Sequence, residues 1–233
     1  MTSDAGADTV VILGDAPHIR AISREDEATV FAAVVEANLK QPEAYAGRIL
    51  DDVMQEAARG LAPLTGATAR EYATLITQAI TVDPTRWRNV GAVFYAGVSI
   101  VGNIAHVCTA GDIRVHLVRN GAVVGVTRDH NAVSDDEDGT YNRAGRGVAS
   151  DPTFLVHVPT RSLPASESKP IECAEWPTLG GDTLLICSSR LHGYQPPAAY
   201  LAPLVQSRVV PELSLAVLIS IAPSRVPPPA SRF

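Results

Sequence analysis

Residues 187–190 of this 233-residue chain are Cys-Ser-Ser-Arg, types that could support nucleophilic attack on a phosphate or an acyl group. Attack by cysteine requires the thiolate, but Cys187 closes an apolar run, where burial disfavours the charged form. A serine nucleophile would need a glycine-flanked turn that exposes its hydroxyl, and neither Ser188 nor Ser189 lies in such a pattern. The segment therefore does not predict a cysteine or serine hydrolase.

The acidic run at 134–139, SDDEDG, could bind calcium through its carboxylates. If Gly139 takes the central glycine position of a calcium-binding loop, the first and twelfth positions fall on Ser134 and Gly145, where acids are required. His106 and His116 are predicted on neighbouring strands, but two histidines without a third ligand make a weak metal site. These residues are more typical of a solvated loop and of structural histidines.

The N-terminal third, which would have to position any site, is predicted to be mainly helical. A short β-type run at 9–13 comes first, closed by a turn at 14–17. Ser23 and Asp26 form a capping-box pattern. The apolar stripe that follows comprises Val30, Phe31, Val34, Val35 and Leu39. The pattern predicts an amphipathic helix that ends near residue 40.

Two more helices are predicted before residue 83. The first carries Tyr45, Ile49 and Val53 on one face and ends near Gly60. The second begins at Thr68, with Glu71 in the position that completes a capping box.

The rest of the chain has β character. An Asn-Gly pair at 120–121 between alternating runs is a strong hairpin signal. The predicted strand-like runs are 90–101, 103–110, 113–119, 122–127, 153–159, 182–188 and 213–221. Residues 195–207 contain prolines and allow a short helix at most. Helices followed by antiparallel strands predict an α+β fold in which helices pack on sheets.

The amino-acid composition limits the classes of protein to which this chain can belong. Hydrophobic residues make up 46% and charged residues 19% of the chain, and the net charge is −6. These are globular values, and the absence of a basic cluster argues against a nucleic-acid partner. No apolar run reaches the length of a membrane span, and residues 1–8 do not resemble a signal peptide. The three cysteines show no metal-binding spacing and are interpreted as reduced thiols of a cytoplasmic protein.

The residues from 89 to 131 resemble the middle segment of the metal-dependent serine/threonine protein phosphatases of type 2C, the PPM family. The segments that carry the resemblance are Gly111-Asp112-Ile113-Arg114, Asn120-Gly121, Thr127–His130, 158–164, 180–194 and 211–220. They occur in the family's order and extend over about two thirds of the chain. The resemblance implies a four-layer α-β-β-α sandwich of two antiparallel sheets flanked by helices. It also implies one domain over 1–222 and a proline-rich tail, expected to be disordered, over 223–233.

The family's activity depends on acids that hold two divalent ions and activate a bridging water. Two doubly charged ions about 4 Å apart repel by on the order of 15 kcal/mol at an effective dielectric near 20, so several carboxylates must offset that repulsion. The family's Asp-Gly-x-Gly-Gly turn, which ends an early strand before the first helix, is assigned here to 13–18. Asp15 is the only acid there, displaced by one position, and it is also a typical turn residue.

The other family acids are also largely replaced. The Asp of the Ser-Asp-Gly motif falls on Ser189, with Arg190 in place of the glycine, and the closing Asp falls on Pro211 or on Glu212. Asp112 remains in the position that serves as an accessory metal ligand and also shapes a turn. Arg190 could bind an anion or form a surface salt bridge. No metal site is expected, and Asp15 and Asp112 are only weak candidates.

These replacements favour a pseudophosphatase that has no catalytic residues and no cofactor. Its expected partner is a phosphoprotein, a kinase or an active phosphatase, with no nucleic acid and no membrane. An active phosphatase that uses Mn²⁺ or Mg²⁺ through Asp15, Asp112 and Glu212 is the alternative, and it requires these three side chains to converge. A structural subunit of a larger assembly is the third hypothesis.

Overall fold

A computed structural model describes residues 8–25, 29–39, 43–61, 68–82, 90–137, 158–164, 170–193 and 195–223. The described strands form two antiparallel sheets of five strands each. The first sheet has the order β1 (Thr9–Gly14), β10 (Leu215–Ser220), β9 (Thr183–Cys187), β6 (Arg114–Arg119) and β7 (Ala122–Val126). The second sheet has the order β2 (Ile19–Glu25), β3 (Thr29–Leu39), β4 (Val90–Val101), β5 (Ile104–Ala110) and β8 (Glu172–Pro177).

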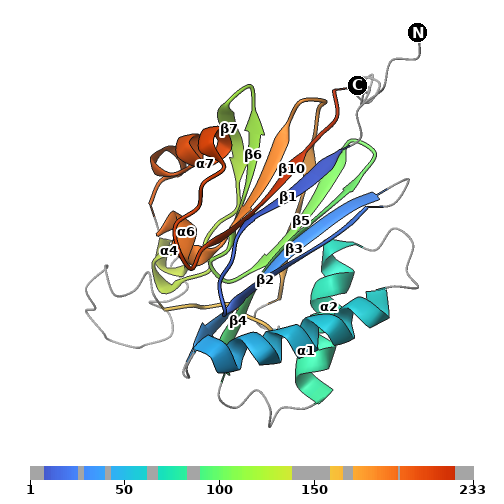
Figure 1. Cartoon of the computed structure of the whole chain (residues 1–233), viewed down its shortest axis with the longest axis vertical. Coiled ribbons are helices and arrows are strands. Elements are labelled where there is room, and N and C mark those ends of the chain that lie inside the picture. Colours follow the sequence, from blue (N-terminus) through green and yellow to red (C-terminus); the bar gives the residue numbers. More distant parts are fainter. Residues whose placement is uncertain are drawn as a thin grey trace.

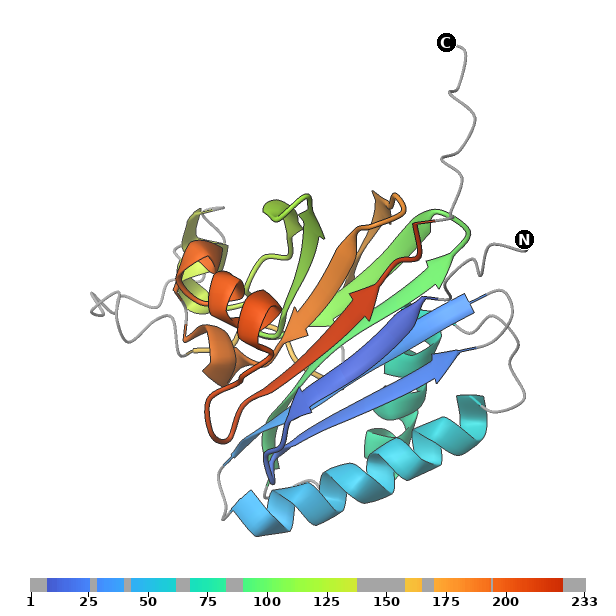
Figure 2. The same cartoon turned by 45° about the horizontal axis from the view of Figure 1, so that its top comes forward.

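The helices flank these sheets. They are α1 (Glu43–Leu61), α2 (Ala69–Val82), α4 (Ala132–Glu137), α6 (Ser189–His192), the 3₁₀ helix η2 (Pro197–Ala199) and α7 (Leu201–Ser207). Figure 1 and Figure 2 show α1 and α2 against the second sheet and α6 and α7 against the first sheet. The predicted α-β-β-α sandwich is therefore confirmed.

The buried side chains form one hydrophobic cluster for each interface between layers. Val34, Val98 and Ile186 belong to the cluster between the two sheets. Tyr72 belongs to the cluster between the second sheet and α1 and α2. Leu204 belongs to the cluster between the first sheet and α6 and α7. Both faces of the central strands are covered, so these strands are apolar on both sides.

The helix predicted over 23–39 is wrong, because this segment forms strands β2 and β3. Along β3 the even-numbered residues from Val30 to Val34 face the other sheet, whereas the odd-numbered residues from Phe31 to Val35 face the helices. A strand buried on both faces has no polar side, so its apolar residues also match a helical period. Ser23, taken as a helix cap, lies within β2.

The two later helices are confirmed as α1 and α2. The capping box at the start of α2 is formed as predicted: the Glu71 N–H donates to Thr68 Oγ1 at 3.2 Å, and the Thr68 N–H donates to Glu71 Oε2 at 2.6 Å. The Asn-Gly hairpin is also confirmed, since Asn120 and Gly121 have φ angles of 52° and 77°. Such a turn needs positive φ at both central positions.

The remaining β predictions have mixed outcomes. The runs around 90–127, 182–188 and 213–221 form β4 to β7, β9 and β10, and 195–207 contains η2 and α7. Strand β8 was not predicted. Most of the run predicted at 153–159 and all but the first residue of the tail at 223–233 lie outside the described residues.

The interpretation of all three cysteines as reduced thiols is wrong. Cys108 on β5 and Cys173 on β8 form a disulfide, whereas Cys187 is a buried free thiol. The two bonded residues face each other in the register of neighbouring strands, which brings residues 65 positions apart into contact. None of the described helices is long and apolar enough to cross a membrane.

Candidate functional site

Glu36 is the one buried acid of the long central strand β3. It pairs in register with Ile19 of β2 and with Phe94 of β4, both of which belong to the core between the two sheets. By the alternation of β3, its side chain therefore points towards the first sheet. Glu36 is 5% exposed, so its carboxyl group needs polar partners.

Ser189, the first residue of α6, supplies those partners from the opposite sheet. The Ser189 N–H donates to Glu36 Oε2 at 2.9 Å, and the Ser189 hydroxyl donates to Glu36 Oε1. Ser188 just before it ties β9 to β10, since its Oγ accepts the Leu215 N–H at 3.1 Å. The end of β9 is thus fixed, and Ser189 is held against Glu36.

Burial and hydrogen bonding act in opposite directions on the pKa of Glu36. Burial raises the pKa of Glu36 above its ordinary value, and the two hydrogen bonds from Ser189 and the positive charge of Arg190 only partly oppose that effect. Arg190 itself is exposed. It is therefore near enough to influence Glu36 electrostatically while its guanidinium stays in solvent.

The other predicted site residues occupy different surroundings. Asp15 is exposed in the turn between β1 and β2, and Glu212 is exposed in the loop between α7 and β10. Asp112 is 1% exposed in the turn between β5 and β6, where its carbonyl oxygen accepts a hydrogen bond from His192 Nε2 at 2.6 Å. The structure thus brings Ser189 and Arg190 to Glu36, but it leaves Asp15 and Glu212 at the surface.

A second polar cluster lies under α6, η2 and α7. Arg114 on β6 forms a two-pronged ion pair with Asp129, with N–O distances of 2.8 and 2.6 Å. Arg114 also donates to the carbonyl oxygen of Gln195 at 2.5 Å and to the Tyr200 hydroxyl at 3.3 Å. The Tyr200 hydroxyl donates in turn to Nε2 of His116 at 2.8 Å.

The histidines of this cluster are held neutral. Burial and the charge of Arg114 lower the pKa of His116 and of His192 to about 4. His106 and His116, predicted on neighbouring strands, lie instead on different sheets, because β5 and β6 belong to different layers. His106 pairs with Glu175, at 3.3 Å between Nδ1 and Oε1, so the two histidines do not form a metal pair.

His130 joins the second sheet to the turn that contains Asp112. Its Nδ1 accepts the Gly111 N–H at 3.1 Å, and its Nε2 lies 2.9 Å from Oε2 of Glu172 on β8. His130 therefore links the Gly111–Asp112 turn to β8.

Solved structures share this fold of two sheets flanked by helices. A serine/threonine phosphatase of Streptococcus agalactiae superposes with a TM-score of 0.64 at 15% identity, over 92% of this chain and 99% of that one. The Mycobacterium tuberculosis phosphatase PstP/Ppp superposes with a TM-score of 0.62 at 15% identity, over 92% of this chain and 99% of that one. The catalytic domain of PstP in complex with two manganese ions superposes with a TM-score of 0.60 at 15% identity, over 92% of this chain and 98% of that one. The chain has the PPM phosphatase fold. No family model matches the sequence, and a search of curated proteins finds no significant match.

The PPM fold changes the assignment of the family's first acidic turn. That turn ends a strand before the first helix, and the strand before α1 is β3 rather than β1. The acid near the end of β3 is Glu36, and it lies opposite Ser189, the residue that matches the Ser-Asp-Gly aspartate. Glu36 near the end of β3 and Ser189 at the start of α6 thus meet across the two sheets.

The residues that meet here do not fit a pair of divalent ions. Both carboxylate oxygens of Glu36 accept hydrogen bonds from Ser189, and a hydroxyl is a poor replacement for a charged ligand. Within the described part of the chain, no three His, Cys, Asp or Glu side chains gather closely enough to hold a metal ion. Asp15, Asp112 and Glu212 therefore do not form such a group in this structure.

Sequence reasoning missed Glu36 because the segment was interpreted as a helix. The signal was present nevertheless: a single acid interrupts the apolar run from Val30 to Ala37. A lone carboxylate in a strand that is buried on both faces needs a dedicated partner, and this property marks it as a site candidate.

Proposed function

We propose that this chain is a PPM-fold protein that acts in phosphosignalling by binding a partner protein rather than by metal-dependent hydrolysis. The observation that carries the proposal is the contact between Glu36 and Ser189. It joins the two sheets through a buried, hydrogen-bonded pair at positions where the resemblance places acids. Hydrolysis through two metal ions needs several carboxylates at that place.

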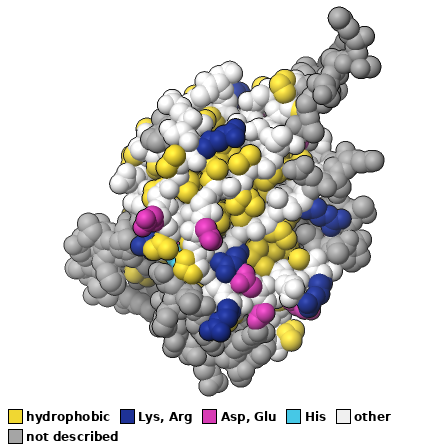
Figure 3. All heavy atoms as spheres, viewed as in Figure 1, with side chains coloured by type: hydrophobic (Ala, Val, Ile, Leu, Met, Phe, Trp, Pro, Cys, Tyr) yellow, Lys and Arg dark blue, Asp and Glu magenta, His cyan; other side chains and the backbone are white. Residues whose placement is uncertain are grey.

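The proposed partner is a phosphorylated protein, a kinase or an active phosphatase. A surface with apolar side chains between scattered charges suits a protein ligand. Figure 3 shows apolar side chains gathered across one face, over the region where Figure 1 draws β1 and β10. Ile12 on β1 contributes to the exposed apolar surface, with 45% of its area accessible.

The alternative is an active phosphatase that recruits Mn²⁺ or Mg²⁺ through unexpected ligands. Asp112 and Glu36 are buried acids that could serve as such ligands, whereas Asp15 and Glu212 lie exposed on separate loops. This alternative requires Glu36 to ionise and to exchange its contact with Ser189 for a cation.

Phosphopeptide hydrolysis measured across a Mn²⁺ titration distinguishes the two. We expect no turnover above the uncatalysed rate by the wild-type protein, and the same result for Glu36→Gln and for Asp15→Ala. Turnover that requires manganese and disappears in Glu36→Gln would overturn the proposal. Calorimetric titration with Mn²⁺ alone provides a second measurement that does not depend on the choice of substrate.

A further inference from the structure

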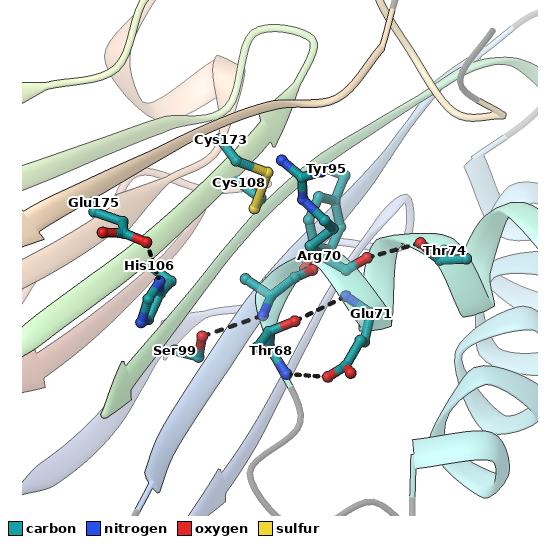
Figure 4. Close-up of a disulfide and its surroundings, with 11 residues drawn as sticks. Thr68, Arg70, Glu71, Thr74, Tyr95, Ser99, His106, Cys108, Cys173 and Glu175 are labelled. Atoms are coloured by element: carbon teal, nitrogen blue, oxygen red, sulfur yellow. Dashed lines mark hydrogen bonds and ion pairs between the residues drawn. A yellow bond between two sulfur atoms is a disulfide. The ribbon is translucent and has the colours of Figure 1, made fainter. Parts of the chain in front are cut away.

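A cavity of about 480 Å³ opens beside the Cys108–Cys173 disulfide, on the side of the second sheet where α2 begins. Its lining includes Thr68, Arg70, His106, Cys108, Cys173, Ala174 and Glu175. Figure 4 shows Arg70 extending from α2 towards the two sulfur atoms, with the His106–Glu175 pair on the other side. This volume is in the range that holds small ligands.

The two sulfur atoms differ in access. Cys108 on the inner strand β5 is 2% exposed, whereas Cys173 on the edge strand β8 is only half-buried. A thiolate that enters the cavity therefore reaches Cys173 first. Cys187 does not compete, because it is fully buried and burial raises its thiol pKa.

The cavity presents one cation and one anion beside the disulfide. Arg70 is exposed on the first turn of α2, and the Glu175 side chain is 71% exposed on β8. A guanidinium suits a carboxylate, and a carboxylate suits an ammonium group. The pair therefore matches a small molecule that carries both charges.

We propose that this cavity is a thiol–disulfide exchange site for a small zwitterionic thiol of the cysteinyl-peptide class. The incoming thiolate attacks Sγ of Cys173, forms a mixed disulfide with it and releases Cys108 as a thiolate, which takes up a proton. A second molecule of the same thiol then attacks the external sulfur of the mixed disulfide. Its attack yields the oxidised dimer of the small thiol and the Cys173 thiol, so two electrons pass from two thiols to the protein.

Exchange at this site connects to the end of the sheets that holds Asp112. Glu172, next to Cys173, binds His130 and also accepts from Arg161 at 3.1 Å, and His130 accepts the Gly111 N–H. Opening the disulfide removes the covalent link between β5 and β8. The contact of Glu172 with His130 is then the next constraint between β8 and the Gly111–Asp112 turn.

In a reducing compartment disulfides are typically transient. Exchange at Cys173 is the reaction that would open this disulfide in such a compartment. The inference does not depend on the proposed function, because the cavity lies on β5, β8 and α2 rather than at Glu36.

The test compares rates of disulfide opening by different thiols. The rate for glutathione divided by the rate for mercaptoethanol measures recognition of charge and cancels changes in the disulfide itself. We expect this ratio to fall by about two- to fivefold in Arg70→Gln, the effect of one exposed charge, and to stay unchanged in the control Arg59→Gln. Arg59 is an exposed arginine of α1 that pairs with Glu56 and does not line the cavity.

A second comparison of thiols tests the role of the Glu175 carboxylate. The ratio of glutathione to mercaptopropionate, which lacks the ammonium group, is expected to fall in Glu175→Gln. Mass spectrometry of the trapped intermediate should place the mixed disulfide on Cys173. Equal ratios in wild type and variants, a mixed disulfide on Cys108, or three free thiols in the unreduced denatured protein would each overturn the proposal.

Discussion

Glu36 and Ser189 meet across the space between the two sheets, where burial raises the pKa of Glu36 and the hydrogen bonds from Ser189 oppose that rise. Because the folded chain raises the pKa of Glu36 above its ordinary 4.5, the unfolded chain loses this proton at lower pH than the folded chain does. The stability that the protonated side chain contributes is present below pH 4.5 and is lost as pH rises through the folded-state value.

Replacing Glu36 with glutamine tests this account. Glutamine is neutral at every pH and can accept the Ser189 N–H while it donates to the Ser189 hydroxyl. We expect Glu36→Gln to be more stable than wild type at pH 7, on the order of 1 kcal/mol, with the difference shrinking towards pH 4. Urea unfolding across that pH range measures it.

The matched control is Glu36→Ala, which leaves the Ser189 N–H and hydroxyl without their partner. It should be less stable than Glu36→Gln by about 1–3 kcal/mol at all pH values. A glutamine variant that is less stable than wild type at pH 7 would show that the folded chain does not raise the pKa of Glu36.

Residues of this kind were only partly predictable. Ser189 and Arg190 were assigned from the sequence, and the structure places both beside Glu36. Glu36 and Cys173 were not found, because their roles depend on partners 153 and 65 positions away. Such contacts follow from strand register across sheets, which no local pattern encodes.

At the scale of elements, the segment from α6 to α7 is held on the first sheet by polar contacts as well as by apolar packing. His116 lies beneath this segment and His192 belongs to it, and both have a folded-state pKa of about 4, compared with an ordinary value of 6.5. The unfolded chain therefore binds protons first as the pH falls. Stability is complete above pH 6.5 and is lost between pH 6.5 and 4.

Unfolding measured between pH 4.5 and 7.5 should show this loss. We expect a slope that approaches about 1.4 kcal/mol per pH unit for each histidine. His116→Gln should flatten the slope, while the control His106→Gln, on the other sheet and half-buried, should leave it unchanged. A slope that is the same in wild type and His116→Gln would contradict the assignment of this histidine as neutral and buried.

Elements with one polar face were predicted well, and elements without one were not. Helices α1 and α2 alternate buried and exposed residues, so their period and the capping box at Thr68 identified them. Strand β3 is buried on both faces and was taken for a helix. Because the segment was taken for a helix, Glu36 was not considered as a site residue.

For the whole molecule, the layers are shared with the phosphatases although the sequences differ at most positions. Superposition on the phosphatases at 11–15% identity covers more than nine tenths of this chain. Buried apolar patterns on ten strands maintain the sandwich, and many different residues satisfy them. Chemistry depends on a few side chains, so it can change while the fold stays.

The dependence of thermal stability on metal ions provides a further prediction. A protein that binds an ion only when folded gains stability with ion concentration. We expect the Tm of this protein to be the same in 1 mM EDTA and in millimolar Mn²⁺, within about 1 °C, since that linkage requires a bound ion. A rise of several degrees with manganese would show a site that Glu36 and its neighbours do not explain.

The serine–glutamate contact also constrains how this site can change over generations. An aspartate at position 189 would place a second carboxyl group against Glu36 within the same buried space. Two carboxylates at that separation repel each other, so one of them must hold a proton or recruit a cation. Replacement of Ser189 by aspartate therefore lowers stability unless an ion binds. Selection for a stable fold alone is enough to keep the serine.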